Sequence, residues 1–303
     1  MRHGRVPFII GFLIAPVTIY VVFVIWPYVQ TFYLSMTNWT GYQTKDWIGF
    51  DNYRRMFRED VFWEAIKHHA IILVALPLVT IIIALFFAYL LNIGGRSRQG
   101  TGLKGVWGSN VYRIVFFFPQ LLALPIIGVL FTTVYRPNSS GLIDGVLIKL
   151  GAQPIGWLTE KNLALWSVIA VLVWQAVGFY VVLFSAGMAS IPKDILEAAE
   201  IDGATQGTLF FRVTLPLLWD TLQVAWVYLG IAAFDAFAIV DVLTVEQGGP
   251  DHSTTVLAEE IYRNAFQNGK PAYASAMGVA LFFLTITFAA LTLRVTRRET
   301  VEL

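Results

Sequence analysis

The sequence contains no cysteine. This absence excludes disulfide bonds, thiolate metal sites, iron–sulfur clusters and a cysteine nucleophile. Charged residues are also scarce: they make up 14% of the 303 residues, against about 25% in soluble domains. The formal net charge is only +1, which gives no general attraction to nucleic acid. The sequence is therefore not that of an ordinary soluble enzyme, and no nucleic-acid partner is expected.

Hydrophobic residues are abundant instead. They make up 57% of the chain, and the mean hydropathy is +0.65. A helix needs about 20 mostly apolar residues to cross a hydrocarbon core of roughly 30 Å. Six runs of this kind carry no Lys or Arg: 6–32, 68–91, 114–135, 163–187, 215–243 and 273–293. They predict an all-α polytopic membrane protein with six transmembrane helices, in which residues 1–303 form a single transmembrane domain in a lipid bilayer.

The predicted orientation rests on the loops. Six spans place both termini on the same side of the membrane, and basic residues are almost evenly divided between the two faces. The 93–113 loop is basic and contains no acidic residue, whereas the opposite segments 34–63, 136–161 and 244–272 mix acids with bases. By the positive-inside rule we predict that both termini are cytoplasmic. We expect short interfacial helices and turns in the opposite segments.

The most informative polar stretch is residues 190–216. Pro192 fits the first turn of a helix, and Asp194 places a carboxylate where it favours the helix dipole. Residues 196–200 have high helix propensity, and Gly203 suits a C-terminal turn. The sequence predicts a helix–turn–helix on the membrane surface, with small alanines that another protein could contact. On physical grounds alone, a solvated loop without a function is the alternative.

The spacing of this stretch is specific. Its residues in order are Glu197, Ala198, Ala199, Asp202, Gly203, Ala204, Phe210, Leu215 and Pro216. This pattern resembles the coupling motif of permease subunits of binding-protein-dependent ABC importers, in the maltose-type carbohydrate branch. The resemblance covers nearly the whole chain, including 47–53, 234–244, 248–250 and 254–266. The chain departs from the family at 219–220, where a frequent proline is absent, and at 245–247.

The resemblance implies the fold of an ABC type I importer permease. Residues 193–203 would then be a cytoplasmic coupling helix that docks on a separate ATPase and converts its closure into movement of the spans. The implied partners are a second, homologous permease subunit in a heterodimer, two cytoplasmic ATPase subunits and an extracytoplasmic sugar-binding protein. The implied location is the plasma membrane of a prokaryote.

The chain has no phosphate-binding G-x-x-x-x-G-K-[ST] motif. We therefore expect a transport subunit without an ATPase site of its own. No cofactor is expected on this chain, because ATP and Mg would be used by the partner ATPase. Serines are present without a matching His/Asp order, and His68 and His69 lack further ligands at metal-binding spacing. Neither a catalytic nor a metal site is predicted.

Polar and aromatic residues inside the predicted spans are candidates for a substrate path. The candidates are Gln120, Trp174, Gln175, Phe179, Tyr228 and Asp235. Pro119 and Pro125 predict a broken helix near the first of them, and the last two share a helical face at a spacing of seven residues. Amides, a carboxylate and flat rings suit a neutral sugar. Each of these side chains could instead only pack or hydrogen-bond between helices.

The predicted spans also lack cations in their interior. A phosphate or carboxylate substrate would favour a cationic partner there, although helix N-termini can sometimes serve. The lack of cations favours a neutral cargo, and with the resemblance it implies ATP-driven import of a neutral mono-, di- or oligosaccharide. The alternative function is an ion-coupled secondary transporter that uses Asp235 as a proton or sodium site. An intramembrane enzyme is a third reading, for which the chain supplies no catalytic group set.

Overall fold

The computed structural model describes residues 5–42, 45–92, 109–244 and 248–296. Arg96, Arg98 and Lys104, which make the 93–113 loop basic, lie outside these ranges, as does the departure at 245–247. Throughout the described ranges the chain is helical apart from turns, loops and one isolated antiparallel bridge between Thr37 and Trp47.

The chain forms two compact units. The first unit consists of Met1–Trp63 and Leu257–Leu284, and the second unit consists of Glu64–Val256 and Thr285–Leu303. The prediction that residues 1–303 form one transmembrane domain stays a prediction.

The first unit contains the N-terminal helix and the start of the last one. Its elements are α1 (Arg5–Tyr20), a π-helical turn (Val21–Ile25), α2 (Trp26–Ser35), α3 (Asp51–Met56), α14 (Leu257–Tyr262), a second π-helical turn (Arg263–Gln267) and the beginning of α15 (Pro271–Thr296). Phe32 of α2 contacts Phe282 of α15 edge to face, with ring centroids 5.8 Å apart. Asn52 of α3 donates to the carbonyls of Ser35 and Thr37 at 2.9 and 2.8 Å. These bonds attach α3 to the end of α2.

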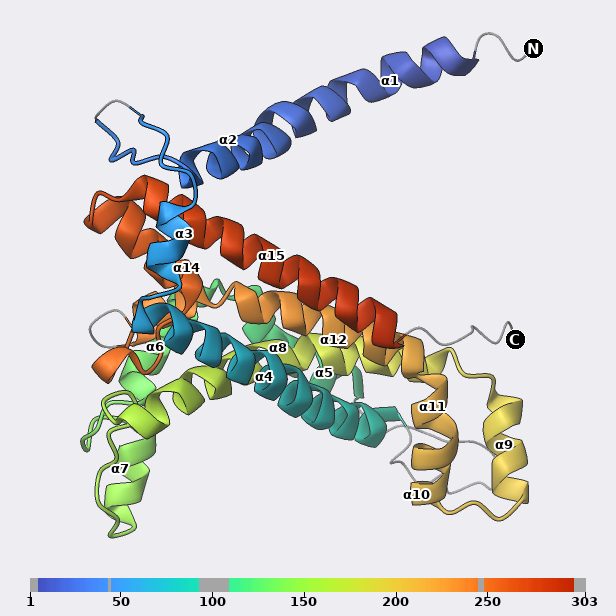
Figure 1. The fold of residues 1–303 in the computed structure, drawn as a ribbon. Helices are drawn as coiled ribbons and strands as arrows, with labels where there is room; N and C mark the ends of the chain where they lie inside the picture. Colours follow the sequence, from blue (N-terminus) through green and yellow to red (C-terminus); the bar gives the residue numbers. More distant parts are fainter. Residues whose placement is uncertain (1–4, 43–44, 93–108, 245–247, 297–303) are drawn as a thin grey trace. The chain divides into compact units, whose positions relative to one another are not determined.

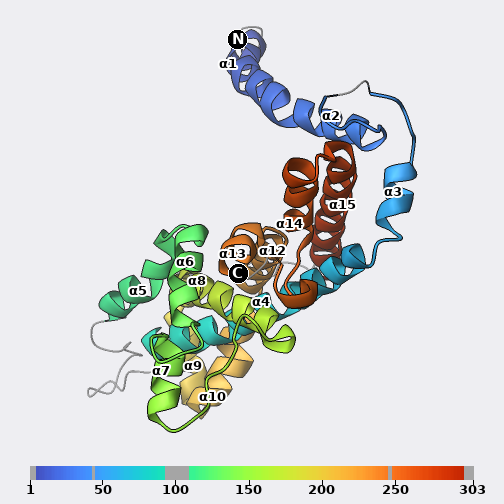
Figure 2. The ribbon, with the colours of Figure 1, turned by 90° about the vertical axis from the view of Figure 1, so that its left-hand side faces the viewer.

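The second unit is built around α8. Its elements are α4 (Asp60–Asn92, from Glu64), α5 (Ser109–Phe117), a 3-10 turn (Phe118–Leu121), α6 (Leu124–Val134), α7 (Leu142–Lys149), α8 (Lys161–Ala189), α9 (Lys193–Ile201), α10 (Gln206–Leu209), a π-helical turn (Phe210–Thr214), α11 (Leu215–Leu217), α12 (Trp219–Phe234), α13 (Phe237–Leu243), a 3-10 turn (Pro250–His252) and the end of α15. The buried side of α8 dominates the core. Helix α5 packs on α8 and α6 packs on α13 (Figure 2).

The apolar helices confirm the predicted all-α polytopic membrane fold. Gly11–Ser35, Asp60–Asn92, Lys161–Ala189 and Pro271–Arg294 are each long and apolar enough to cross a membrane, and counting each of two bent pairs as one span gives six. One bent pair replaces the third predicted span, with 99° between Val111–Leu121 and Leu124–Val134. The break falls where Pro119 and Pro125 predicted it, because proline has no N–H to continue the helical hydrogen bonds.

The fifth predicted span, 215–243, is wrong in its start and in its continuity. Gln206–Leu217 lies before a bend of 69°, and α12 begins only at Trp219. Pro216 supplies no N–H at this bend. Helix α12 then ends at Phe234, and Asp235 is its C-cap with φ −103° and ψ 35°. Asp235 therefore lies at a break between α12 and α13 and not inside a continuous helix. We find no local sequence feature that explains this second break.

Candidate functional site

The first half of the 190–216 loop is a capped helix, as predicted. Helix α9 begins after Pro192 and ends at Ile201. Gly203 has φ +83°, a backbone conformation that glycine adopts without strain. Its N–H donates to the carbonyl of Glu200 at 3.0 Å, and the N–H of Ala204 donates to the carbonyl of Ala199 at 3.0 Å. These two bonds form a Schellman motif, which satisfies carbonyls at the helix end.

This geometry gives a physical reason for part of the sequence motif. The Schellman motif joins the residue after the left-handed glycine to the fifth residue before it. In this chain those residues are Ala204 and Ala199, at the two ends of the segment that carries Asp202 and Gly203. The spacing between the alanine pair and the glycine is therefore the spacing that ends α9 in a sharp turn.

The inner side of α9 packs on the second half of the loop. Leu196 is buried together with Ile191 and Leu209, and Ala199 and Val213 pack against them. The opposite side of α9 is exposed and includes Glu197, Ala198, Ile201, Asp202 and Gly203. The side chain of Ile201 stands out, because it is apolar and 87% exposed. Of the two motif alanines, one therefore faces solvent and the other contributes to the small core of the loop.

The second half of the loop runs from Thr205 to Leu217. The hydroxyl of Thr205 accepts from the N–H of Thr208 at 3.3 Å and caps α10. The hydroxyl of Thr214 donates to the carbonyl of Leu209 at 3.2 Å inside the π-helical turn. Leu215 is half-buried and Pro216 is exposed, just before the 69° bend into α12. The motif's final pair thus marks a bend and not the start of a span.

The loop is attached to the end of α4. The hydroxyl of Tyr89 donates to Oε1 of Gln206 at 3.1 Å, and its ring packs edge to face on Phe210 at 4.9 Å. Figure 1 shows α9 to α11 at one end of the second unit and α7 at the other end. No sequence pattern points to this role of Tyr89, because a lone tyrosine near the end of an apolar run is also expected at a membrane interface.

The substrate-path candidates fall into separate places. Trp174 and Pro119, the neighbour of Gln120, line an apolar cavity of about 780 Å³ with residues of α4, α5 and α8. Gln175 and Gln120 are half-buried. Phe179 is exposed and follows Gly178, which lines the cavity.

Tyr228 and Asp235 are exposed on α12 and at its end, and neither lines that cavity. Of the six candidates only Trp174 therefore lines this cavity, together with the neighbour of Gln120, and those of the fifth predicted span lie elsewhere.

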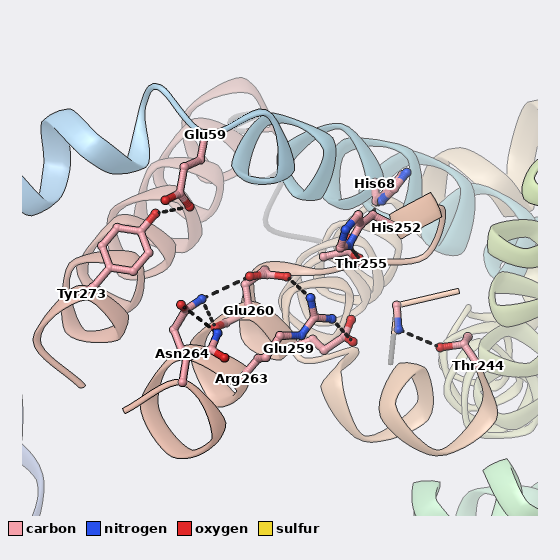
Figure 3. A network of polar contacts seen from close by, with 12 residues as sticks. Glu59, His68, Thr244, His252, Thr255, Glu259, Glu260, Arg263, Asn264 and Tyr273 are labelled. Carbon is pink, nitrogen blue, oxygen red and sulfur yellow. Dashed lines mark hydrogen bonds and ion pairs between the residues drawn. The ribbon is translucent and has the colours of Figure 1, made fainter. Parts of the chain in front are cut away.

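A polar network in the first unit lies outside the residues singled out from the sequence (Figure 3). Arg263 contacts Glu259 at 3.1 Å and Glu260 at 2.9 Å, and Asn264 donates to Glu260 at 3.2 Å. Glu259 is 1% exposed and Glu260 is 6% exposed. The sequence signal for this network is the spacing of Arg263, which follows Glu260 by three residues and Glu259 by four, as in ion pairs on one side of a helix.

Replacement of Arg263 by methionine should lower the free energy of unfolding by about 3 kcal/mol, because it removes the cation that contacts two buried carboxylates. The measurement is thermal unfolding of the purified protein in detergent. Arg54→Met is the matched control, since Arg54 pairs with Asp51 at the same spacing of three residues on an exposed surface; it should cost less than about 1 kcal/mol. Equal effects of the two substitutions would contradict this prediction.

The histidines and acids in the described ranges do not gather into a metal site. No group of three or more His, Asp or Glu side chains in those ranges could hold an ion. His68 is buried and donates from Nδ1 to the carbonyl of Thr255 at 2.9 Å, and His69 is buried against Phe234 with ring centroids 5.3 Å apart. Both histidines have internal contacts in the second unit.

Comparison with known proteins gives a consistent result. Residues 70–301 match the family described as binding-protein-dependent transport system inner membrane component. The chain is 40% identical over 301 residues to the diacetylchitobiose uptake system permease protein of Streptomyces coelicolor, covering 98% of this chain and 84% of that protein. It is 31% identical over 288 residues to the multiple sugar-binding transport system permease protein of Streptococcus mutans, covering 95% and 94%.

A solved structure shares the fold. It is that of a bacterial ABC transporter involved in the import of the acidic polysaccharide alginate, with a TM-score of 0.81 and 22% identity. The match covers 98% of this chain and 97% of that one. At this identity the likeness concerns the fold alone.

Proposed function

Because this chain belongs to the family of binding-protein-dependent transport system inner membrane components, we propose that it is the membrane-spanning subunit of an ATP-driven ABC importer for a neutral sugar. The single observation that carries the proposal is the 190–216 loop. Its first half is the short, capped helix α9, whose outer side is exposed. Its second half is attached to α4 by Tyr89 and continues into α12 through a bend. Such an element can receive movement from a protein below the membrane and pass it to the spans.

The proposed contact with the ATPase is the outer side of α9 and the turn that follows it. Glu197 and Asp202 offer carboxylates, and Ala198 leaves room for close approach. Ala199, Gly203 and Ala204 hold the turn through the Schellman motif. Leu215 and Pro216 lie at the bend where the loop meets α12. Only some of the motif would therefore touch the ATPase, while the rest holds its shape.

The proposed orientation follows from the loop. If the loop contacts a cytoplasmic ATPase, α7 at the opposite end of the second unit lies on the outer side (Figure 1). Six spans then place both termini in the cytoplasm, in the plasma membrane of a prokaryote. The proposed partners are a second, homologous permease, two ATPase subunits and an extracytoplasmic sugar-binding protein. ATP and Mg would bind to the ATPase subunits, and this chain would hold no cofactor.

The proposed cargo is a neutral saccharide. The two relatives are a diacetylchitobiose uptake permease and a multiple sugar-binding transport permease. Lys and Arg in the described helices that qualify as spans lie towards the helix ends, as with Lys161 in α8 and Arg294 in α15. The apolar middle of such helices favours an uncharged substrate over an anion. Gln120, Trp174, Gln175, Phe179, Tyr228 and Asp235 are the proposed substrate-path residues.

Uptake by the intact complex tests the function. The complex is purified through a tag on this chain and reconstituted in liposomes with ATP inside and binding protein outside. Labelled neutral sugars, beginning with diacetylchitobiose, should accumulate only when ATP is hydrolysed. Free mono- or disaccharides should compete, whereas sugar phosphates should not, because the middle of the four long apolar helices carries no Lys or Arg to pair with a phosphate.

Two outcomes would overturn the proposal. Uptake driven by an ion gradient in the absence of an ATPase would establish a secondary transporter instead. Tight binding and uptake of a sugar phosphate with no uncharged competitor would contradict the neutral cargo. Mass spectrometry of the purified complex identifies the partner subunits in the same preparation.

A further inference from the structure

The ends of three helices in the second unit are connected by one amide side chain. Asn92 is the last residue of α4. Its Nδ2 donates to the hydroxyl of Ser185 on α8 at 2.9 Å and to the carbonyl of Ala88 at 2.7 Å. Its Oδ1 accepts from Nη2 of Arg113 on α5 at 2.7 Å. A single side chain therefore joins the ends of α4, α5 and α8 by hydrogen bonds.

The cluster of Asn92, Ser185 and Arg113 is largely shielded from solvent. Ser185 is 2% exposed, and Asn92 and Arg113 are half-buried. The sequence predicts that Arg113 belongs to the basic 93–113 loop, but the structure has it inside α5. An internal hydrogen bond to a charged group contributes more than one between neutral groups. The hydrogen bond from Arg113 to Asn92 should accordingly be stronger than the one from Asn92 to Ser185.

The same turn of α4 also contacts the 190–216 loop. Tyr89 lies three residues before Asn92, which places the two side chains on neighbouring positions of the helix surface. Tyr89 contacts Gln206 and Phe210 of the loop, while Asn92 contacts α5 and α8. The last turn of α4 thus lies between the loop and two further helices.

We propose that Asn92 is a positioning residue that makes the ends of α4, α5 and α8 move as one body with the 190–216 loop. This inference rests on the proposed function, because it assigns a route for the movement that the ATPase imposes on the loop. The order of contacts is α9 to α10 through Leu196 and Leu209, α10 to α4 through Tyr89, and α4 to α5 and α8 through Asn92. The helices also pack through apolar side chains such as Phe87 and Phe116, but without the amide the ends of α4, α5 and α8 would lose the polar contacts that fix them to one another.

The absence of cysteine in the chain allows a direct test by paired spin labels. Labels are attached to Tyr112→Cys on α5 and Phe211→Cys in the π-helical turn after α10, two positions with exposed side chains outside the proposed ATPase contact. The distance between the labels is measured in the reconstituted complex without nucleotide and with ATP and vanadate. With Asn92 present, the distance should be the same in both states. With Asn92→Leu, it should shift or broaden when nucleotide binds.

Variants of the partners make the test specific. Ser185→Ala and Arg113→Met should each give part of the effect of Asn92→Leu, and Arg113→Lys should restore the parent behaviour, since lysine retains a donor. Ser167→Ala is the matched control. Ser167 is a buried serine on the same helix whose hydroxyl makes one hydrogen bond, to Trp157 at 2.9 Å, at the other end of α8.

Coupling efficiency gives the second readout. Sugar taken up per ATP hydrolysed should fall about fivefold for Ser185→Ala, the factor that corresponds to one hydrogen bond of ordinary net strength. It should be unchanged for Ser167→Ala. If Asn92→Leu does not assemble, Ser185→Ala and Arg113→Met decide the question.

Two results would overturn the inference. One is a parent complex in which the label distance already changes with nucleotide, because the helices and the loop would then not form one body. The other is parent-like behaviour of Asn92→Leu, Ser185→Ala and Arg113→Met in assembled complexes. Failure of the proposed function is read separately, as uptake that does not depend on ATP in the complex without substitutions.

Discussion

Replacement of Gly178 by alanine is expected to prevent stable folding of the second unit. A Cβ atom at this position would overlap the carbonyl oxygen and the carbonyl carbon of Phe116. Both atoms belong to the backbone of α5, so no side-chain rotation can relieve the overlap. Helix α5 would have to leave α8, which should lower the free energy of unfolding by about 3 kcal/mol or more. Fluorescence-detected gel filtration after heating measures the loss.

Gly278→Ala is the control for this substitution. Gly278 also lies in a long membrane helix, but the nearest atom to its Cβ position is 3.9 Å away, on Thr31. The added methyl should be neutral or slightly stabilising there, because alanine favours a helix over glycine by about 1 kcal/mol. A Gly178→Ala protein as heat-stable as Gly278→Ala would mean that α5 does not lie on α8 as described.

Replacement of Gly203 by proline should abolish sugar uptake and its coupling to ATP hydrolysis. Gly203 has φ +83° and its N–H donates to Glu200. Proline removes this donor and requires φ near −65°, so the Schellman motif cannot form. The end of α9 would lose its turn, and the exposed side that carries Glu197 and Asp202 would change direction. Uptake and ATP hydrolysis are measured in the reconstituted complex.

The chain supplies a matched control at the end of α7. Gly151 has φ +86°, its N–H donates to the carbonyl of Ile148 at 3.0 Å, and Ala152 donates to Leu147 at 2.9 Å. This is the same motif at the opposite end of the second unit. Gly151→Pro should damage its turn to a similar degree and leave ATP-coupled uptake largely intact. Intact coupling in Gly203→Pro would remove the 190–216 loop from the proposed mechanism.

The features that were predictable from the sequence are local ones. The capped helix α9 was found because its cap depends on residues within one turn, from Ala199 to Ala204. The break at Pro119 was likewise found, because a missing N–H acts at its own position. The long apolar helices could be predicted from the length and composition of the apolar runs, because the lipid bilayer constrains both.

The features that were missed depend on packing between distant segments. The break at Asp235 has no proline or glycine beside it to indicate it, so the sequence predicts a continuous helix through Asp235. The bonds of Asn92 join residues 93 and 21 positions apart in the sequence. No periodicity within one helix predicts them. The grouping of Trp174 with Pro119 around one cavity equally requires the path of the broken helix.

The length of α4 affects how the membrane surrounds this protein. Its 33 residues give a rod about 50 Å long, whereas the hydrocarbon layer is only about 30 Å thick. The helix must therefore lean away from the bilayer normal or project beyond the lipid, and Asp60, Glu64 and Lys67 in its first turns suit the headgroup zone. Bilayer thickness thus helps to set the tilt of the helix that carries Tyr89 and Asn92.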